Sequence, residues 1–241
     1  MRRKSKKKPN YEDSRKNQLA FLNACKVDAL DLISEYFYDA HNEINCIDTE
    51  GKSALHLAVV HKRISVIKLL ISQDKLNIDQ FDQIFTTPLY QAVKTNSIDI
   101  VELLCQNKAN PNIKCLNLGW TPVHCSAKYG LKEILLTLVR HSGNIHEKDN
   151  LGLNTLFHAA ICGQKHLIDM LLDLGIEINE TDDNGKTALF WAIFYHKTST
   201  AKLLIEKGIN IHIKDNCGND ALFHARLRQL KDLTKLMIEM D

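Results

Sequence analysis

Apolar and polar residues alternate in blocks along this chain, and the blocks recur every 33 or 34 residues. Each unit opens with an eleven-residue stretch that is mostly polar at first and then apolar. It continues into a second apolar stretch, such as Ile67-Lys68-Leu69-Leu70 or Ala201-Lys202-Leu203-Leu204. The six copies start at Asp48, Asp82, Leu116, Asp149, Asp182 and Asp215. A period of this length indicates an array in which each unit packs only against its neighbours.

Several positions of the unit meet the physical requirements of a turn followed by a helix. The fourth position is glycine in five copies, because a tight turn needs positive φ, and Phe85 is the exception. The sixth position holds residues that can cap a helix N-terminus: Ser53, Thr87, Thr121, Asn154, Thr187 and Asp220. Proline follows in two copies, at the first helical position, where it is tolerated. A helix is therefore predicted after each cap, with Leu or Val at position eight and a small residue at position eleven, where neighbouring helices approach closely.

These copies, for example DTEGKSALHLA from Asp48 and DDNGKTALFWA from Asp182, resemble the ankyrin repeat, whose family motif runs D-x-x-G-x-T-P-L-H-x-A. The resemblance extends over about residues 48–240. It implies an all-α solenoid, in which each repeat supplies a hairpin-like turn and two antiparallel helices. It also implies that His56 and His124, at position nine, join adjacent hairpins by hydrogen bonds.

The two ends of the array differ from the central repeats in the way that is typical of capping units. Residues 17–37 look like a degenerate first helix pair, so we expect a capping unit over 15–47 and a basic, disordered tail over 1–14. Near the other end, Arg226 occupies a stacking position that is apolar in the other repeats, and a charge is tolerated there only where no further repeat covers it. We therefore expect one ankyrin-repeat domain over 15–241, made of one cap and six repeats, with no appended domain.

Composition and charge narrow the class of protein further. No apolar run approaches the roughly 18 residues of a membrane span, and no apolar stretch follows the basic N-terminus as in a secretory signal. The seven cysteines form neither a CxxC pair nor a zinc-type spacing, so a reduced intracellular compartment, cytoplasmic or nuclear, is expected. Without six cations near the N-terminus, 25 basic residues stand against 29 acidic ones. This balance argues against a solenoid whose main surface binds nucleic acid.

The sequence offers no catalytic motif. A glycine-rich phosphate loop, a G-x-S-x-G elbow and an H-E-x-x-H motif are all missing from it. Rings such as Tyr90 and Phe157 replace histidine at position nine in other copies, so this position is expected to serve packing. Neighbouring carboxylates such as Asp182 and Asp183 follow from the repeat itself. We therefore expect a protein that is not an enzyme and has no catalytic residues, metal or cofactor.

The ankyrin resemblance also implies which positions look outward on the concave face. These are positions two, three and five of the turn, and positions thirteen and fourteen at the end of the first helix. In the middle of this array many of them are apolar, and exposed apolar patches usually mark interaction sites. The predicted partner-binding residues are Leu118, Trp120, Tyr129, Leu151, Leu153, Ile161, Phe194 and Tyr195. The alternative is that Leu118 and Leu153 pack on neighbouring turns and the helix residues belong to the core.

Six cations stand before the first carboxylate, and they are Arg2, Arg3, Lys4, Lys6, Lys7 and Lys8. Three interpretations are open: a nuclear import signal bound by an importin, a weak electrostatic contact with nucleic acid or anionic membrane, or a solubilising end. The ankyrin resemblance further implies hydroxylation of asparagine in the loop between repeats. Asn112 and Asn179 occupy the matching position.

The function expected from these features is non-catalytic binding of another protein on the concave face, through an extended peptide or an amphipathic helix. The chain would then act as an adaptor, a competitor or an inhibitor. The alternatives are a nucleic-acid- or chromatin-associated regulator that works through the basic tail, and a microbial effector that targets a host protein. A purely structural role is the remaining class.

Overall fold

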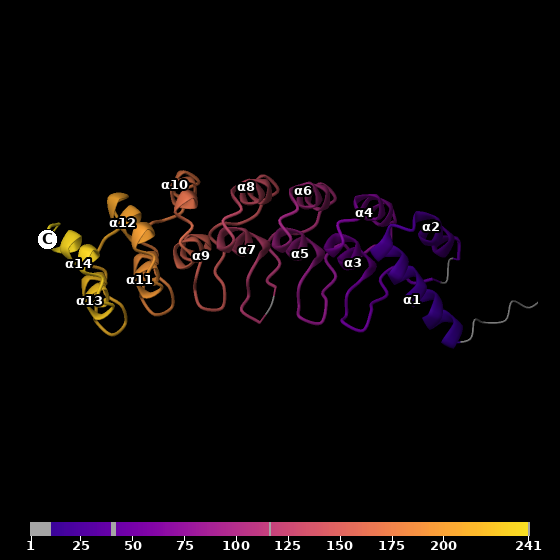
Figure 1. Cartoon of the computed structure of the whole chain (residues 1–241), viewed down its shortest axis with the longest axis horizontal. Helices are drawn as coiled ribbons and strands as arrows, with labels where there is room; N and C mark the ends of the chain where they lie inside the picture. Colours follow the sequence, from indigo (N-terminus) through magenta and orange to yellow (C-terminus); the bar gives the residue numbers. More distant parts are fainter. Residues whose placement is uncertain (1–10, 40–41, 116, 241) are drawn as a thin grey trace, which may run out of the picture.

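The computed structural model describes residues 11–39, 42–115 and 117–240. Within these ranges the chain forms fourteen helices arranged as successive pairs in a row (Figure 1). The first pair consists of α1 (Tyr11–Val27) and α2 (Leu30–Tyr38). The described residues contain isolated β-bridges but no strand, so the predicted all-α solenoid of paired helices is confirmed.

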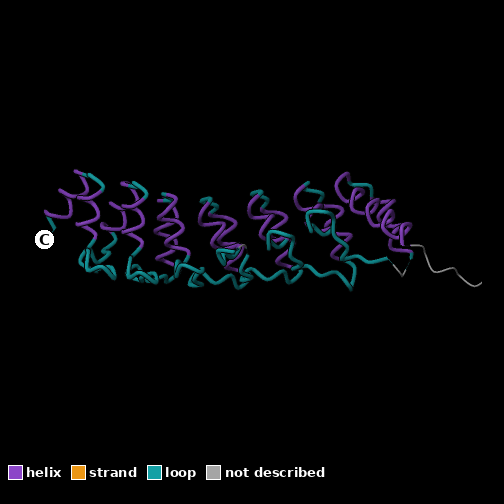
Figure 2. Tube along the Cα trace, turned by 90° about the horizontal axis from the view of Figure 1, so that it is seen from below, coloured by secondary structure: helices purple, strands orange, loops and turns teal. Residues whose placement is uncertain are grey.

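Each of the six later pairs has an inner helix, which follows a hairpin-like turn, and an outer helix. The inner helices are α3 (Ala54–Val60), α5 (Pro88–Lys94), α7 (Pro122–Lys128), α9 (Thr155–Cys162), α11 (Ala188–Phe194) and α13 (Ala221–Leu227). The outer helices are α4 (Ile64–Ile71), α6 (Ile98–Gln106), α8 (Lys132–Arg140), α10 (Lys165–Asp173), α12 (Thr198–Glu206) and α14 (Lys231–Ile238). We call the turn before each inner helix a finger and number fingers and repeats one to six. Figure 2 shows the loops gathered along one edge of the row.

The inner helices begin where the capping residues predict. Five of the six side chains accept a backbone N–H of the first helical turn, as Ser53 does from His56 and Asn154 from Leu156. Each such bond satisfies an amide that has no partner within the helix. Thr187 is the exception to the prediction, because its hydroxyl makes no capping bond and is buried without a partner.

The core runs along the whole row between inner and outer helices. Each inner helix packs on the inner helix of the next repeat, and α1 packs on α3. The small residue at position eleven is fully buried in all six repeats, as Ala58 and Ser126 illustrate. Small side chains at this position let neighbouring helices pack closely, which confirms the role predicted for it.

The cap differs from the prediction in its start. Helix α1 begins at Tyr11, so the disordered tail expected over 1–14 overlaps a helix. Phe21 of α1 stacks on Tyr36 of α2 with ring centroids 4.1 Å apart, and Arg63 Nε donates to the carbonyl of Lys26 at 2.9 Å. These contacts pack the two cap helices together and tie them to repeat one.

Phe85 holds the finger position that is glycine in the other repeats, and it adopts φ of 57°. A side chain with a Cβ is strained in this left-handed region. We expect Phe85→Gly to raise the free energy of unfolding by about 1 kcal/mol in urea titrations, by relieving that strain. Phe85→Ala is the matched control, because it removes the same ring but keeps the Cβ. Equal stabilities of the two variants would contradict the strain.

Candidate functional site

The inner face is the surface formed by the fingers and the C-terminal ends of the inner helices. In repeat three it carries Trp120 from the finger and Lys128 and Tyr129 from the end of α7. The ammonium of Lys128 lies 4.3 Å from the centroid of the Trp120 ring and 5.6 Å from that of Tyr129. A cation over an aromatic face is attracted by the ring quadrupole. The finger and the helix end of repeat three thus form one cluster of two aromatic rings and a cation, which we call the first aromatic group.

Repeats five and six carry a second aromatic group on the same face. The Trp191 and Tyr195 rings are stacked at 6.1 Å, and Phe194 meets Tyr195 edge to face at 5.2 Å. The guanidinium of Arg228, from repeat six, lies 4.0 Å from the Phe194 centroid, and the Lys186 ammonium lies 5.8 Å from Trp191. A small cavity of about 120 Å³ opens among these side chains, and it is lined by Lys186, Phe190, Trp191, Phe194 and His224.

Repeat four lies between the two aromatic groups. Burial raises the pKa of the Cys162 thiol at the end of α9, and the positive charges of Lys128 and Lys197 act in the opposite direction. One of these lysines comes from repeat three and the other from repeat five.

The structure places most, but not all, of the predicted partner-binding residues at the surface. Five side chains are 45–48% exposed, and they are Leu118, Tyr129, Leu151, Phe194 and Tyr195. Trp120 and Ile161 are half-buried and pack against the core. Leu153 is only 2% exposed, so its assignment to an exposed surface is wrong. Its side chain has no polar end to keep in water, unlike Lys52 and Lys186 at the same position, and it is buried in the core.

Trp191 is not among the predicted partner-binding residues, because position ten of the repeat has no common residue type. Leu57 and Gln91 occupy it in the first two repeats, whereas His158 and His224 occupy it in the fourth and sixth. In the structure the Trp191 indole N–H donates to Asp182 at 2.9 Å. The signal in the sequence is an N–H donor nine residues after an aspartate, and it recurs in the last three repeats.

A buried aspartate holds each of these fingers in place. Asp149 Oδ1 accepts the amides of Leu151 and Leu153 at 2.9 and 3.0 Å, and Oδ2 accepts His158 Nε2 and Trp120 Nε1, both at 3.1 Å. Burial acts to raise the pKa of this carboxyl, but the hydrogen bonds outweigh burial and lower it. Trp120 is therefore a structural link between fingers three and four as well as a surface ring.

The histidines at position nine join adjacent hairpins, as the family resemblance implied. Nδ1 of His124 accepts the Thr121 amide at 3.1 Å, so Nε2 carries the proton and donates to the carbonyl of Glu147 at 2.8 Å. His56 bonds in the same way to the Ser53 amide and the Thr86 carbonyl. With both nitrogens engaged and the side chains fully buried, these rings serve the fold.

The loop asparagines proposed for hydroxylation link successive repeats. Asn112 Oδ1 accepts the Asn144 amide at 2.8 Å, and Asn112 Nδ2 donates to the carbonyl of Ser142 at 2.8 Å. Asn179 Oδ1 accepts the Asn210 amide at 2.8 Å. Hydroxylation of Asn112 and Asn179 stays a prediction, and the six cations of the N-terminal run lie outside the described residues.

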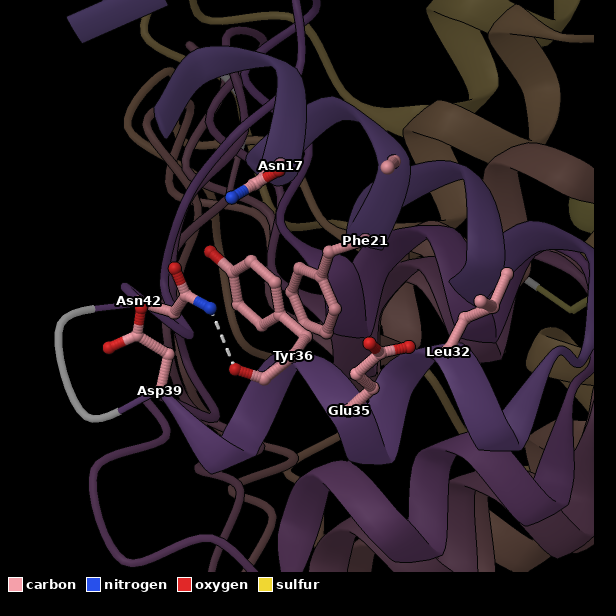
Figure 3. Close-up of a pocket in the computed structure, with 8 residues that line it drawn as sticks. Asn17, Phe21, Leu32, Glu35, Tyr36, Asp39 and Asn42 are labelled. Carbon is pink, nitrogen blue, oxygen red and sulfur yellow. Dashed lines mark hydrogen bonds between the residues drawn. The ribbon is translucent and has the colours of Figure 1, made fainter. Parts of the chain in front are cut away.

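A hollow of about 360 Å³ lies on the cap, beside the stacked rings of Phe21 and Tyr36 (Figure 3). Asn42 closes one side by donating from Nδ2 to the carbonyl of Tyr36 at 2.8 Å. Its lining joins these rings to polar side chains such as Asn17 and Glu35.

Among the residues that the structure describes, no group of three or more His, Cys, Asp and Glu side chains is arranged to hold a metal ion. No helix among residues 11–39, 42–115 and 117–240 is long and apolar enough to cross a bilayer. All seven cysteines are free thiols, five of them buried.

Known proteins resemble this chain in both sequence and fold. It is 30% identical to human neurogenic locus notch homolog protein 1 over 134 residues, which is 55% of this chain and 5% of that protein. It is 32% identical over 117 residues to a putative ankyrin repeat protein of Acanthamoeba polyphaga mimivirus, which is 48% of this chain and 15% of that protein. It is 28% identical over 124 residues to the putative ankyrin repeat protein YahD of Escherichia coli, which is 49% of this chain and 61% of that protein. The chain thus spans less than two thirds of each relative.

Two solved structures match the fold over most of their length. The ankyrin repeat domain of Bcl-3, a member of the IkappaB protein family, superposes with a TM-score of 0.78 at 20% identity, covering 90% of this chain and 97% of that one. An ankyrin repeat domain from Acinetobacter baumannii AYE superposes with a TM-score of 0.68 at 28% identity, covering 76% of this chain and 95% of that one. A family model for ankyrin repeats in three copies matches residues 21–115, 76–149, 110–182 and 142–215. The chain belongs to the ankyrin-repeat family.

Proposed function

We propose that this chain binds a partner protein through the inner face of repeats three to six, as a non-catalytic adaptor, competitor or inhibitor. The observation that carries the proposal is the exposure of large apolar side chains on one face. Tyr129, Leu151, Phe194 and Tyr195 are each nearly half exposed. Burying such side chains against a partner is favourable, and aromatic residues dominate the energy of interfaces.

The rigidity of the array supports the same proposal. Finger amides donate to carbonyls of the preceding finger, as Asn150 does to Leu118 at 3.0 Å and Asn216 to Asn184 at 2.9 Å. The buried aspartates fix the fingers from within. A surface held in one conformation loses little entropy when it binds, so its side-chain contacts contribute more fully to affinity.

The test compares partner retention by the full chain and by the triple variant Tyr129→Ala, Phe194→Ala, Tyr195→Ala. We expect the variant to retain its partner at least about tenfold less in quantitative pull-downs, because three interface anchors are removed. Trp120 is left intact, because its bond to Asp149 stabilises the fold. Circular dichroism and thermal unfolding would establish that both proteins are folded.

The matched control removes three exposed apolar side chains from the cap, in Leu19→Ala, Leu32→Ala, Tyr38→Ala. These side chains are 55–89% exposed, so they are at least as accessible as the three on the inner face. Equal loss in both variants, or loss only in the cap variant, would move the binding surface away from the inner face.

The basic N-terminal run suggests a second interaction. Six cations between positions 2 and 8 suit recognition by an importin, and a nuclear or cytoplasmic location follows from that interpretation. Its support is the sequence alone, so this stays a prediction beside the proposed binding on the inner face.

A further inference from the structure

We propose that the partner segment bound by the inner face is an acidic peptide in which carboxylates alternate with apolar or aromatic side chains. The proposal rests on the function proposed above and adds the chemistry of the ligand. It is carried by the distribution of charge between the two sides of the array, by the way in which the cations of the inner face are held, and by their placement among exposed rings.

Acidic side chains are absent from the whole stretch of each repeat that supplies the helical part of the inner face. The six inner helices and the residues that connect them to the outer helices contain no Asp or Glu, over 54–63, 88–97, 122–131, 155–164, 188–197 and 221–230. The outer helices, in contrast, carry Asp99, Glu102, Glu133, Asp169, Asp173, Glu206 and Asp232. The outer helices carry as many basic as acidic residues, whereas the inner stretches carry basic residues alone, so the inner side is the one that favours an anionic ligand.

Three cations on the inner face of repeats three to six are held over rings instead of being paired with acids. Lys128 lies over Trp120, Lys186 near Trp191, and Arg228 over Phe194. Within the described part of the chain none of these three cations forms an ion pair with a carboxylate, whereas outer-side Lys207 pairs with Asp169. A carboxylate of a ligand can approach the half-buried cations without displacing an existing partner.

Apolar side chains separate the cations along the face, which sets the pattern of the ligand. Tyr129 stands beside Lys128, Ile161 lies in repeat four, and Phe194 and Tyr195 lie between Lys186 and Arg228. A ligand that matches this order presents a carboxylate, then an apolar group, then a carboxylate. Each apolar group of the ligand would bury surface that the array leaves exposed.

Nucleic acid is the competing polyanion, and the same features disfavour it. The array without its N-terminal cations carries more acidic than basic residues, so its wider field repels a chain with one charge per nucleotide. A short acidic peptide, in contrast, needs favourable charge only at the few sites where its carboxylates lie.

The experiment measures fluorescence anisotropy of the full chain with pools of labelled peptides of about 12 residues, a length that spans several repeats. Three pools contain Leu and Phe at fixed positions, and the residues between them are Glu in the first pool, Gln in the second and Lys in the third. A fourth pool contains only Glu and Ser. We expect the Glu–Leu/Phe pool to bind at least about tenfold more tightly than the Gln, Lys and Glu–Ser pools. Its affinity should fall between about 50 and about 300 mM salt.

Two matched variants locate this preference on the inner face. The variant Lys128→Gln, Lys186→Gln, Arg228→Gln should lose the preference for Glu over Gln. The variant Lys68→Gln, Lys132→Gln, Lys165→Gln, with three exposed lysines changed on outer helices, should keep it. Both variants retain the basic residues 2–8, so any contribution of that run to peptide binding is equal in the two.

Four results would overturn the proposal. These are equal binding of the Glu and Gln pools, an acidic preference that survives the inner-face variant, binding of no pool, and tighter inner-face binding of an oligothymidylate probe than of the acidic pool. The proposed function is decided separately by the Tyr129, Phe194 and Tyr195 variant. If that variant loses its partner while the Glu and Gln pools bind the full chain with equal affinity, the inner face remains the proposed binding surface and the acidic peptide is rejected as its ligand.

Discussion

Asp149→Ala is expected to lower the free energy of unfolding by roughly 3–5 kcal/mol, the cost of removing one partner from a buried charged network. The carboxylate accepts two backbone amides of finger four, the imidazole of His158 and the indole of Trp120. Alanine leaves these four donors, two of them buried and two partly buried, without their acceptor. Urea unfolding at neutral pH, followed by circular dichroism, measures the effect.

Two further substitutions separate charge from position. Asp149→Asn keeps an acceptor for the finger amides but turns an amide NH₂ toward two N–H donors, so we expect a loss of roughly 2–3 kcal/mol. Asp183→Ala, at an exposed position of the neighbouring finger, should change stability by less than about 0.5 kcal/mol. A loss below about 1 kcal/mol for Asp149→Ala would contradict the role of the aspartate in holding the fingers.

Acid is expected to destabilise the array between about pH 6.5 and pH 4, the range in which His124 takes up a proton in the unfolded chain but not in the folded one. Burial, with a smaller effect of neighbouring His158, lowers the pKa of His124 from 6.5 to about 4. As pH falls through this range the unfolded chain takes up a proton at His124 and the folded chain does not. The folded state therefore loses free energy relative to the unfolded state, by about 3 kcal/mol for this one group.

The measurement is urea unfolding at a series of pH values from 7.5 to about 4.5. Burial lowers the pKa of His56 as well, so its contribution has the same sign. His124→Tyr should flatten the curve, because Tyr90 occupies the same position in repeat two and does not titrate in this range. The pKa of Asp149 and of Asp215 is lowered below 3.8, so their stabilisation is lost only at lower pH. An unchanged pH dependence in His124→Tyr would contradict this assignment.

The fold was predictable because its rules are local and repeat six times. A capping residue, a positive-φ glycine and a small residue at position eleven recur at fixed spacing, and each has one physical reason. Phe85 was visible as the exception, and the structure shows φ of 57° there. Thr187 shows the limit of local rules, because whether a threonine hydroxyl reaches the helix amides depends on the finger geometry around it.

The candidate site was predictable only in part, because exposure depends on how repeats stack. Leu153 and Leu151 are two residues apart in one finger, yet Leu153 is buried and Leu151 is 48% exposed. Trp191 is flanked in its inner helix by the buried Phe190 and Ala192, yet its indole N–H bonds to Asp182 and its ring stays half-buried on the inner face. The cation–ring contacts between repeats, such as Arg228 over Phe194, arise only after stacking.

The central claim is that a partner protein lies on the inner face, and site-specific photocrosslinking tests it most directly. A benzoyl-phenylalanine replaces Tyr195 on the inner face or Lys132 on outer helix α8, both exposed positions, in a chain bound to its retained partner. We expect a covalent adduct with the partner from position 195 and none from position 132. An adduct from position 132 with none from position 195 would place the partner on the outer helices and contradict binding on the inner face.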